Sequence, residues 1–128
     1  MKILLDTHAF LWWATDDPRL SATARAAIGD EANKVLISAA CAWEIATKHR
    51  LGKLGEAAGT VARFGELVAA DGFEHLSVTY LHALRAGSYP SMHRDPFDRM
   101  LAAQSELEGL PLVTLDHAFE DFGTKTLW

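Results

Sequence analysis

Two short runs of apolar residues in this chain each end at an aspartate. Residues 3–5 lead into Asp6, and residues 112–115 lead into Asp116. A continuous apolar run bounded by polar residues is typical of a strand that is buried in a parallel sheet. Ligands of open α/β sheets bind beyond the carboxyl ends of the strands. The two aspartates therefore indicate one site that the fold assembles from opposite ends of the chain.

Length and composition limit the class of protein. With 128 residues, 49% of them hydrophobic, the chain can form one domain with a real core, and we expect a single domain over residues 1–128. The formal net charge of −5 weighs against a nucleic-acid binder that relies on bulk positive charge. It does not weigh against an enzyme whose own site holds several of the acids.

Cysteine content and hydropathy indicate a cytoplasmic protein. Cys41 is the only cysteine, so no disulfide can form within the chain, and we expect it to be a small buried residue. The apolar run at the start is interrupted by Asp6 and His8 before it could serve as a signal peptide. No stretch is long and apolar enough to span a membrane.

Strand and helix signals alternate along the chain. We predict strands at residues 2–5, 35–38, 73–78, 111–115 and 124–127. We predict helices at residues 7–14, 21–28, 39–51, 60–70, 79–87 and 96–108, and a short helical segment at 118–122. Ser21 and Asp95 are expected N-caps, and Pro96 suits the first helical position. This alternation predicts an α/β fold with a central parallel sheet and right-handed crossovers.

Asp6 and Asp116 each have an ordinary structural interpretation as well as a functional one. Either could cap the helix or turn that follows it. Their shared position at strand ends favours a common site, together with two further acids on the helices, Glu44 and Asp98. Clustered carboxylates repel one another, and a hard divalent cation removes that conflict by binding several of their oxygens.

The two helical acids differ in how clearly the sequence orients them. Glu44 could form an exposed pair with Lys48 one turn later, or it could face the crevice, and periodicity does not decide between these. Asp98 precedes Ala102 and Ser105 at spacings of four and seven, which place small residues on its own helix face. Because such a face can pack closely, we expect Asp98 to point inward over the sheet end.

Three segments carry a resemblance to a known family. They are LLDTHAFLWW at residues 4–13, SAACAWEIATKHRLGKL at 38–54 and HRDPFDRMLAAQSELEGLPLVTLDHAF at 93–119. Together they resemble the PIN-domain family, specifically the VapC-type toxins of bacterial and archaeal toxin–antitoxin pairs. The chain departs from the family pattern at Cys41, Met100 and Ser105, where serine, leucine and alanine are common, and none of these positions is an acid.

The resemblance implies a PIN-like three-layer α/β/α fold with a central parallel sheet of four to five strands. It implies an endoribonuclease that depends on Mg²⁺ or Mn²⁺ and hydrolyses RNA phosphodiester bonds. By motif position, its catalytic and metal-binding quartet would be Asp6, Glu44, Asp98 and Asp116. The expected partners are an RNA substrate, a cognate VapB-type antitoxin that covers the site, and a second copy of the chain in a homodimer.

Residues around the quartet have proposed supporting roles. Thr114 and Ser38 could orient carboxylates or water, although Ser38 also suits a helix cap. Asp95 is expected to cap its helix and to support the site without contacting the ion. Arg94 and Arg99, and less strongly Lys48, could form a basic rim that grips RNA phosphates; the alternative is a solvated charged face.

Two other functions remain compatible with the residues. The first is another magnesium-dependent enzyme of phosphate chemistry, such as a phosphatase or a receiver-like domain with a phosphoryl-accepting aspartate. The sequence lacks the second aspartate of a DxD-type loop at Asp6 and any Walker-type glycine loop. The second is a catalytically inert PIN-fold module that uses its acids only for stability.

Overall fold

A sheet of five parallel strands forms the centre of the molecule in the computed structural model, which describes residues 1–128. Its strands are β1 (Lys2–Leu5), β2 (Lys34–Ser38), β3 (Glu74–Leu76), β4 (Leu112–Val113) and β5 (Thr126–Leu127). They lie in the order β3-β2-β1-β4-β5. The chain builds outward from β1 to β3 and then returns to add β4 and β5 on the other side. The strand order thus reverses between β1 and β4, where a parallel sheet opens a crevice at its carboxyl end.

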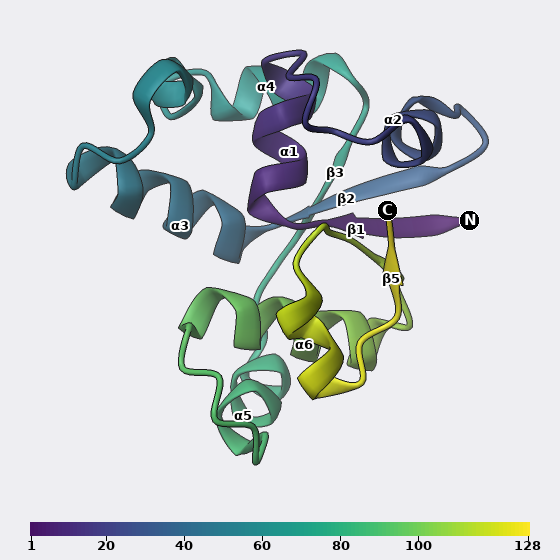
Figure 1. The fold of residues 1–128 in the computed structure, drawn as a ribbon, viewed down its shortest axis with the longest axis vertical. Helices are drawn as coiled ribbons and strands as arrows, with labels where there is room; N and C mark the ends of the chain where they lie inside the picture. Colours follow the sequence, from purple (N-terminus) through teal and green to yellow (C-terminus); the bar gives the residue numbers. More distant parts are fainter.

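Helices cover both faces of this sheet. They are α1 (Thr7–Ala14), α2 (Ala22–Gly29), α3 (Ala39–Arg50), α4 (Phe64–Ala70), α5 (Tyr80–Ser88) and α6 (Pro96–Glu108), with 3₁₀ helices η1 (Gly55–Thr60) and η2 (His117–Phe122). Figure 1 shows α1, α2 and α4 on one side of the sheet and α5 and α6 on the other, while α3 and η1 extend away from it. The architecture confirms the predicted three-layer α/β fold with a parallel sheet.

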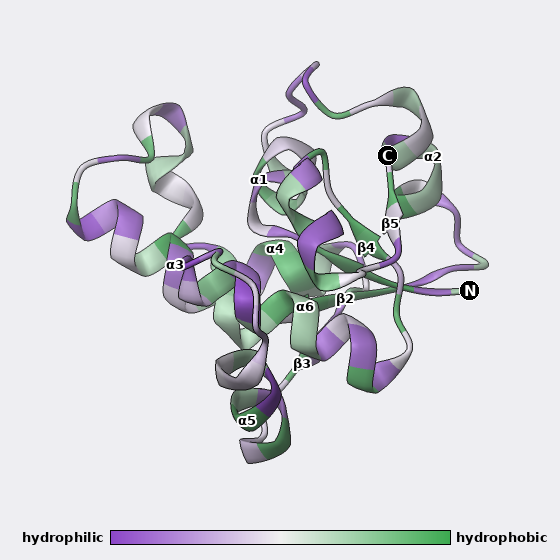
Figure 2. Cartoon of the chain, turned by 60° about the horizontal axis from the view of Figure 1, so that its bottom comes forward, coloured by the Kyte–Doolittle hydropathy of each residue, from purple (hydrophilic) through white to green (hydrophobic).

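The core lies around β1, the middle strand. Ile3, Leu4 and Leu5 have no exposed surface, because β1 has a strand on each side and helices over both faces. In Figure 2 much of the middle of the sheet, around β2 and β4, has the green colour of hydrophobic residues. Burying each such aliphatic side chain stabilises the fold by roughly 1.5–3 kcal/mol. Because residues 3–5 are buried in this way, Asp6 is placed at the carboxyl end of a fully buried strand.

Most predicted elements agree with the structure, and several ends differ. The predicted bounds of β1, α1 and α6 are confirmed, and Ser21 and Asp95 act as the expected N-caps. The helix predicted over residues 60–70 is wrong in its first turn, because Thr60 ends the 3₁₀ helix η1 and α4 begins only at Phe64. Strands β3, β4 and β5 are shorter than predicted.

Cys41 is fully buried, as expected, with its thiol 3.7 Å from the carbonyl oxygen of Leu5. Burial raises the pKa of this thiol to about 12. At neutral pH it is a protonated core side chain and not a nucleophile. Among the helices, none is long and apolar enough to cross a bilayer.

Candidate functional site

Asp6 lies where β1 ends and α1 begins, and it is bound from both sides. Its Oδ1 accepts a hydrogen bond from the backbone N–H of Ala9 at 2.7 Å, so it caps α1. Its Oδ2 accepts a hydrogen bond from Thr114 Oγ1 at 2.5 Å. Thr114 follows β4, the neighbouring strand, and its hydroxyl also accepts from the backbone N–H of Asp116 at 3.0 Å. Thr114 thus connects the two aspartates that follow β1 and β4.

The Asp6 carboxyl is buried, with 7% of its surface exposed. Burial raises its pKa to about 6 against the opposing effect of the bonds from Thr114 and Ala9, and the negative charges of Glu44 and Asp116 raise it further. The cap interpretation of Asp6 is therefore correct but incomplete. A carboxylate that only capped a helix would gain from exposure to water, whereas this one is held where its charge is costly.

Glu44 points inward from α3 and is also buried. Its Oε1 accepts from Thr7 Oγ1 at 2.5 Å, and its Oε2 lies 2.6 Å from the Lys48 ammonium. The pairing of Glu44 with Lys48 that the spacing allows is present, but it involves a buried carboxylate and not an exposed helix face. Thr7, which the sequence analysis did not single out, directly follows Asp6, so its hydrogen bond connects Glu44 to the start of α1 beside Asp6.

Asp98 lies in the first turn of α6, as predicted, and is partly buried. Its Oδ2 lies 2.8 Å from Nε2 of His93. Burial raises the pKa of Asp98 to about 6, His93 opposes this rise, and the charges of Asp95 and Glu44 add to it. Asp95 is the N-cap of α6, and its Oδ1 accepts from the backbone N–H groups of Phe97 and Asp98.

Asp116 is the exposed member of the quartet. Its Oδ1 accepts from the backbone N–H of Ala118 at 2.9 Å and so caps the 3₁₀ helix η2. Its charge still acts on Asp6, whose pKa it helps to raise. The four acids thus form an electrostatic group, because Glu44 acts on both Asp6 and Asp98 while Asp116 acts on Asp6.

The chemistry of these donors fits a hard divalent cation. All are carboxylate oxygens, the ligands that Mg²⁺ and Mn²⁺ prefer, and a bound cation would offset the cost of burial and the smaller effect of neighbouring negative charges, which together raise the pKa values of Asp6 and Asp98. The side chains do not stand in a metal-binding arrangement, however: no group of three or more His, Cys, Asp or Glu residues does so. Their oxygens are engaged by Thr7, Lys48, His93 and Thr114.

Ser38 lies apart from this group in its contacts. Its hydroxyl caps α3 by accepting from the backbone N–H of Ala40 at 3.0 Å, as the alternative interpretation has it. It also donates to Oε1 of Gln104 at 2.5 Å, and the Gln104 amide in turn donates to the carbonyl of Ser77 at 3.2 Å. Ser38 therefore ties α3 to α6 and has no hydrogen bond to any of the four acids.

The basic residues predicted to contact RNA have different environments. Arg94 is exposed, and Lys48 is paired with Glu44. Arg99 directs its guanidinium at backbone carbonyls of the preceding segment, between Ala86 and His93. The predicted role of Arg99 in gripping phosphate therefore conflicts with its contacts, because its donors already have partners.

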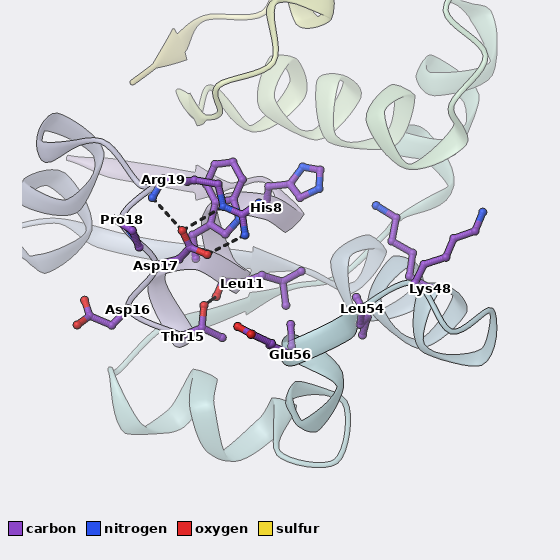
Figure 3. A pocket seen from close by; sticks show the side chains of 13 residues that line it. His8, Leu11, Thr15, Asp16, Asp17, Pro18, Arg19, Lys48, Leu54 and Glu56 are labelled. Atoms are coloured by element: carbon purple, nitrogen blue, oxygen red, sulfur yellow. Dashed lines mark hydrogen bonds and ion pairs between the residues drawn. The ribbon is translucent and has the colours of Figure 1, made fainter.

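A cavity of about 530 Å³ lies between α1 and the segment from α3 to η1, and none of the four acids lines it. Figure 3 shows His8 and Lys48 on its wall, together with Arg19 and Glu56. The His8 ring stacks on Trp12 with ring centres 5.5 Å apart. Lys48 connects this cavity to the acidic group, because it lines the cavity and its ammonium pairs with Glu44.

We expect Asp6→Asn to stabilise the metal-free protein. The folded-state pKa of about 6 lies above the ordinary aspartate value of 3.8. Ionisation of Asp6 therefore destabilises the fold as pH rises from about 4 to about 6, and this loss of stability persists at higher pH. Asparagine retains the capping oxygen without the charge. The free energy of unfolding at pH 7.5 should rise by about 1–3 kcal/mol, less at pH 4.5.

Chemical denaturation in the presence of a chelator measures this difference. Asp121→Asn is the matched control, because Asp121 is exposed and has no hydrogen bond to a neighbouring side chain. Its substitution should leave stability unchanged. A large loss of stability in Asp6→Asn would instead mean that the carboxylate is chiefly structural.

Comparison with known proteins identifies the family. The model of the family described as PIN domain matches residues 3–125. Ribonuclease VapC16 of Mycobacterium tuberculosis (strain ATCC 25618 / H37Rv) is 40% identical over 80 residues, a match that spans 58% of this chain and 57% of that protein. A chain in the crystal structure of VapBC2 from Rickettsia felis bound to a DNA fragment from their promoter superposes with a TM-score of 0.71. That match is 14% identical and covers 98% of this chain and 96% of the other, so it shows a shared fold. The chain belongs to the PIN domain family.

Proposed function

We propose that this chain is a divalent-metal-dependent endoribonuclease of the VapC type, which hydrolyses RNA phosphodiester bonds. The observation that carries the proposal is the electrostatic convergence of the acids. Asp6 follows β1 and Asp98 lies in α6, yet burial raises the pKa of each to about 6, and Glu44 contributes to both rises. Membership of the PIN domain family and the name of the mycobacterial relative support it.

The proposed roles follow from where each acid lies. Asp6, Asp98 and Asp116 would hold Mg²⁺ or Mn²⁺, and Glu44 would either join them or take the proton from the attacking water. A cation bound there shields the anionic phosphate and lowers the pKa of bound water. The chain itself supplies Thr114 and Thr7, whose hydroxyls orient Asp6 and Glu44, and Asp95, which fixes the first turn below Asp98.

The acids must exchange their present partners for an ion. Lys48 has to leave Glu44 Oε2, or share it, and each threonine can keep one oxygen of its carboxylate while the other turns to the metal. Lys48 lines the cavity beside the site, so an ammonium that leaves Glu44 stays within reach of that cavity. We propose that RNA enters here, with Lys48 as a phosphate contact, and that the exposed Arg94, which lies outside this cavity, contacts a further phosphate.

RNA cleavage by the purified protein tests the proposal. We expect cleavage of total RNA with Mg²⁺ or Mn²⁺, none with a chelator, and loss of at least about 100-fold in rate for Asp6→Asn and Asp98→Asn, since each removes a proposed metal ligand. Mapping of the cut ends by gel or sequencing measures the reaction. Asp121→Asn is the control and should cleave like the wild type.

Two outcomes would favour the rival functions. Rapid covalent labelling of the protein by a phosphate donor, without RNA cleavage, would indicate a phosphoryl-transfer enzyme. Full RNA binding with no cleavage under any metal, and unchanged behaviour in both aspartate variants, would indicate an inert binding module.

We further propose that a VapB-type antitoxin binds this chain and covers the acidic group. The superposition on a chain of the VapBC2 structure supports the fold that such a partner would recognise. Expression of the wild-type chain alone should then arrest growth, because unrestrained cleavage depletes RNA, and co-expression of the partner should restore it. Colony counts after induction measure this effect. Arrest by Asp6→Asn at equal expression would contradict the link between growth arrest and RNA cleavage.

A homodimer is the other proposed assembly, and α5 supplies the surface. Tyr80, Leu81 and Leu84 are exposed, with 75%, 56% and 66% of their surfaces accessible. All three are uncharged, so the same patch on a second copy could pack against them without desolvating a charge. We expect Leu84→Glu to convert a dimer into a monomer in light-scattering measurements, whereas Glu31→Lys, on the exposed turn after α2, should not.

A further inference from the structure

Arg99 makes an unusually complete set of hydrogen bonds to the main chain. Its Nε donates to the carbonyl of Ala86 at 2.8 Å. Its Nη1 donates to Ser91 and His93 at 3.1 and 2.7 Å. Its Nη2 donates to Gly87 and Tyr89 at 3.5 and 2.6 Å. A guanidinium has five N–H donors, and here each of them has a carbonyl acceptor.

Those carbonyls belong to the end of α5 and to the segment that joins it to α6. Ala86 and Gly87 lie in the last turn of α5, where carbonyl oxygens lack partners within the helix and a positive charge is favourable. Arg99 therefore closes this helix end and fixes the course of residues 89–93 in one step. The Phe122 ring lies on the same guanidinium, with its centre 5.9 Å from Cζ.

The segment held in this way carries His93. The His93 carbonyl is one of the five acceptors, and its ring contacts Asp98 Oδ2 at 2.8 Å. The same ring packs edge-on against Phe122, with ring centres 5.5 Å apart. The backbone and the ring of His93 are thus both fixed. The other oxygen of Asp98, Oδ1, has no hydrogen bond and is free to bind a ligand.

We propose that Arg99 and His93 are positioning residues for Asp98: Arg99 fixes the 89–93 segment, and His93 holds Oδ2 so that Oδ1 is presented to the metal. This inference rests on the proposed function in that it takes Asp98 to be a metal ligand. It replaces phosphate binding as the role of Arg99. Lysine cannot substitute, because an ammonium has three donors and no planar fork to reach five carbonyls.

A double-mutant cycle tests the inference in the full-length protein. Arg99→Lys and His93→Ala should each lower kcat by about 10–100-fold, the usual effect of losing a group that orients a metal ligand, with KM for RNA within about twofold of wild type. The double variant should be no slower than the slower single variant, because both act through the same carboxylate. His93→Gln, which keeps an N–H donor, should recover most of the lost kcat.

Metal affinity supplies a readout that does not depend on cleavage. Calorimetric titration with Mn²⁺ should show weaker binding by about 10–100-fold in Arg99→Lys and in His93→Ala. Arg63→Lys is the control, because Arg63 is an exposed arginine whose Nε pairs with Glu66 at 3.5 Å and which has no contact with the 89–93 segment. It should match the wild type in both measurements.

The outcomes separate this inference from the proposed function. A wild type that shows no metal-dependent cleavage contradicts the proposed function. An active wild type whose Arg99→Lys variant keeps kcat but raises KM contradicts the inference and returns Arg99 to phosphate binding. Additive losses in the double variant, or His93→Ala with unchanged kcat and Mn²⁺ affinity, would also overturn it.

Discussion

The hydrogen bond between Thr114 and Asp6 depends directly on the pairing of β1 with β4. Leu5 and Val113 are partners in the register, and the backbone N–H of Asp6 donates to the carbonyl of Val113 at 3.1 Å. The next residue of each strand must then lie side by side, which puts the threonine hydroxyl against the carboxylate. A buried carboxylate without such donors would be far more costly. The acidic site therefore exists because two central strands meet in one register.

Hydrogen bonds from the residues next to the Thr114–Asp6 contact connect it to the rest of the site. Thr7, directly after Asp6, binds Glu44 and so couples α1 to α3. Thr114 binds the backbone of Asp116 and so couples the end of β4 to η2. Only Asp98 is held independently, by the segment before α6. The proposed site thus has two supports of different origin, one in the sheet and one in the Arg99-bound segment.

Much of the fold and part of the site could be predicted from the sequence. The apolar runs before Asp6 and Asp116 located both aspartates, because a buried parallel strand has a simple signal. The inward direction of Glu44 could not be predicted, since its neighbours on the same face of α3, which include Ala40, Thr47 and Lys48, are a mixed set of polar and apolar residues. The roles of Thr7, His93 and Arg99 come from tertiary contacts between separate elements, which periodicity along one element does not encode. The helix predicted from residue 60 begins too early, because Thr60 belongs to the 3₁₀ helix η1 and α4 begins at Phe64.

The ion pair between Glu44 and Lys48 determines the charge around Glu44 in the metal-free protein. A buried glutamate normally needs a counter-charge, and here its own helix provides one from the next turn. The apoprotein thereby neutralises part of its acidic centre with an internal ammonium. Binding of a divalent ion at Glu44, as proposed above, would then be an exchange of cations, in which the incoming ion competes with the Lys48 ammonium. The measured affinity for the metal would then report the difference in binding free energy at Glu44 between the ion and the Lys48 ammonium. Only an ion that binds Glu44 more favourably than this ammonium does would displace it.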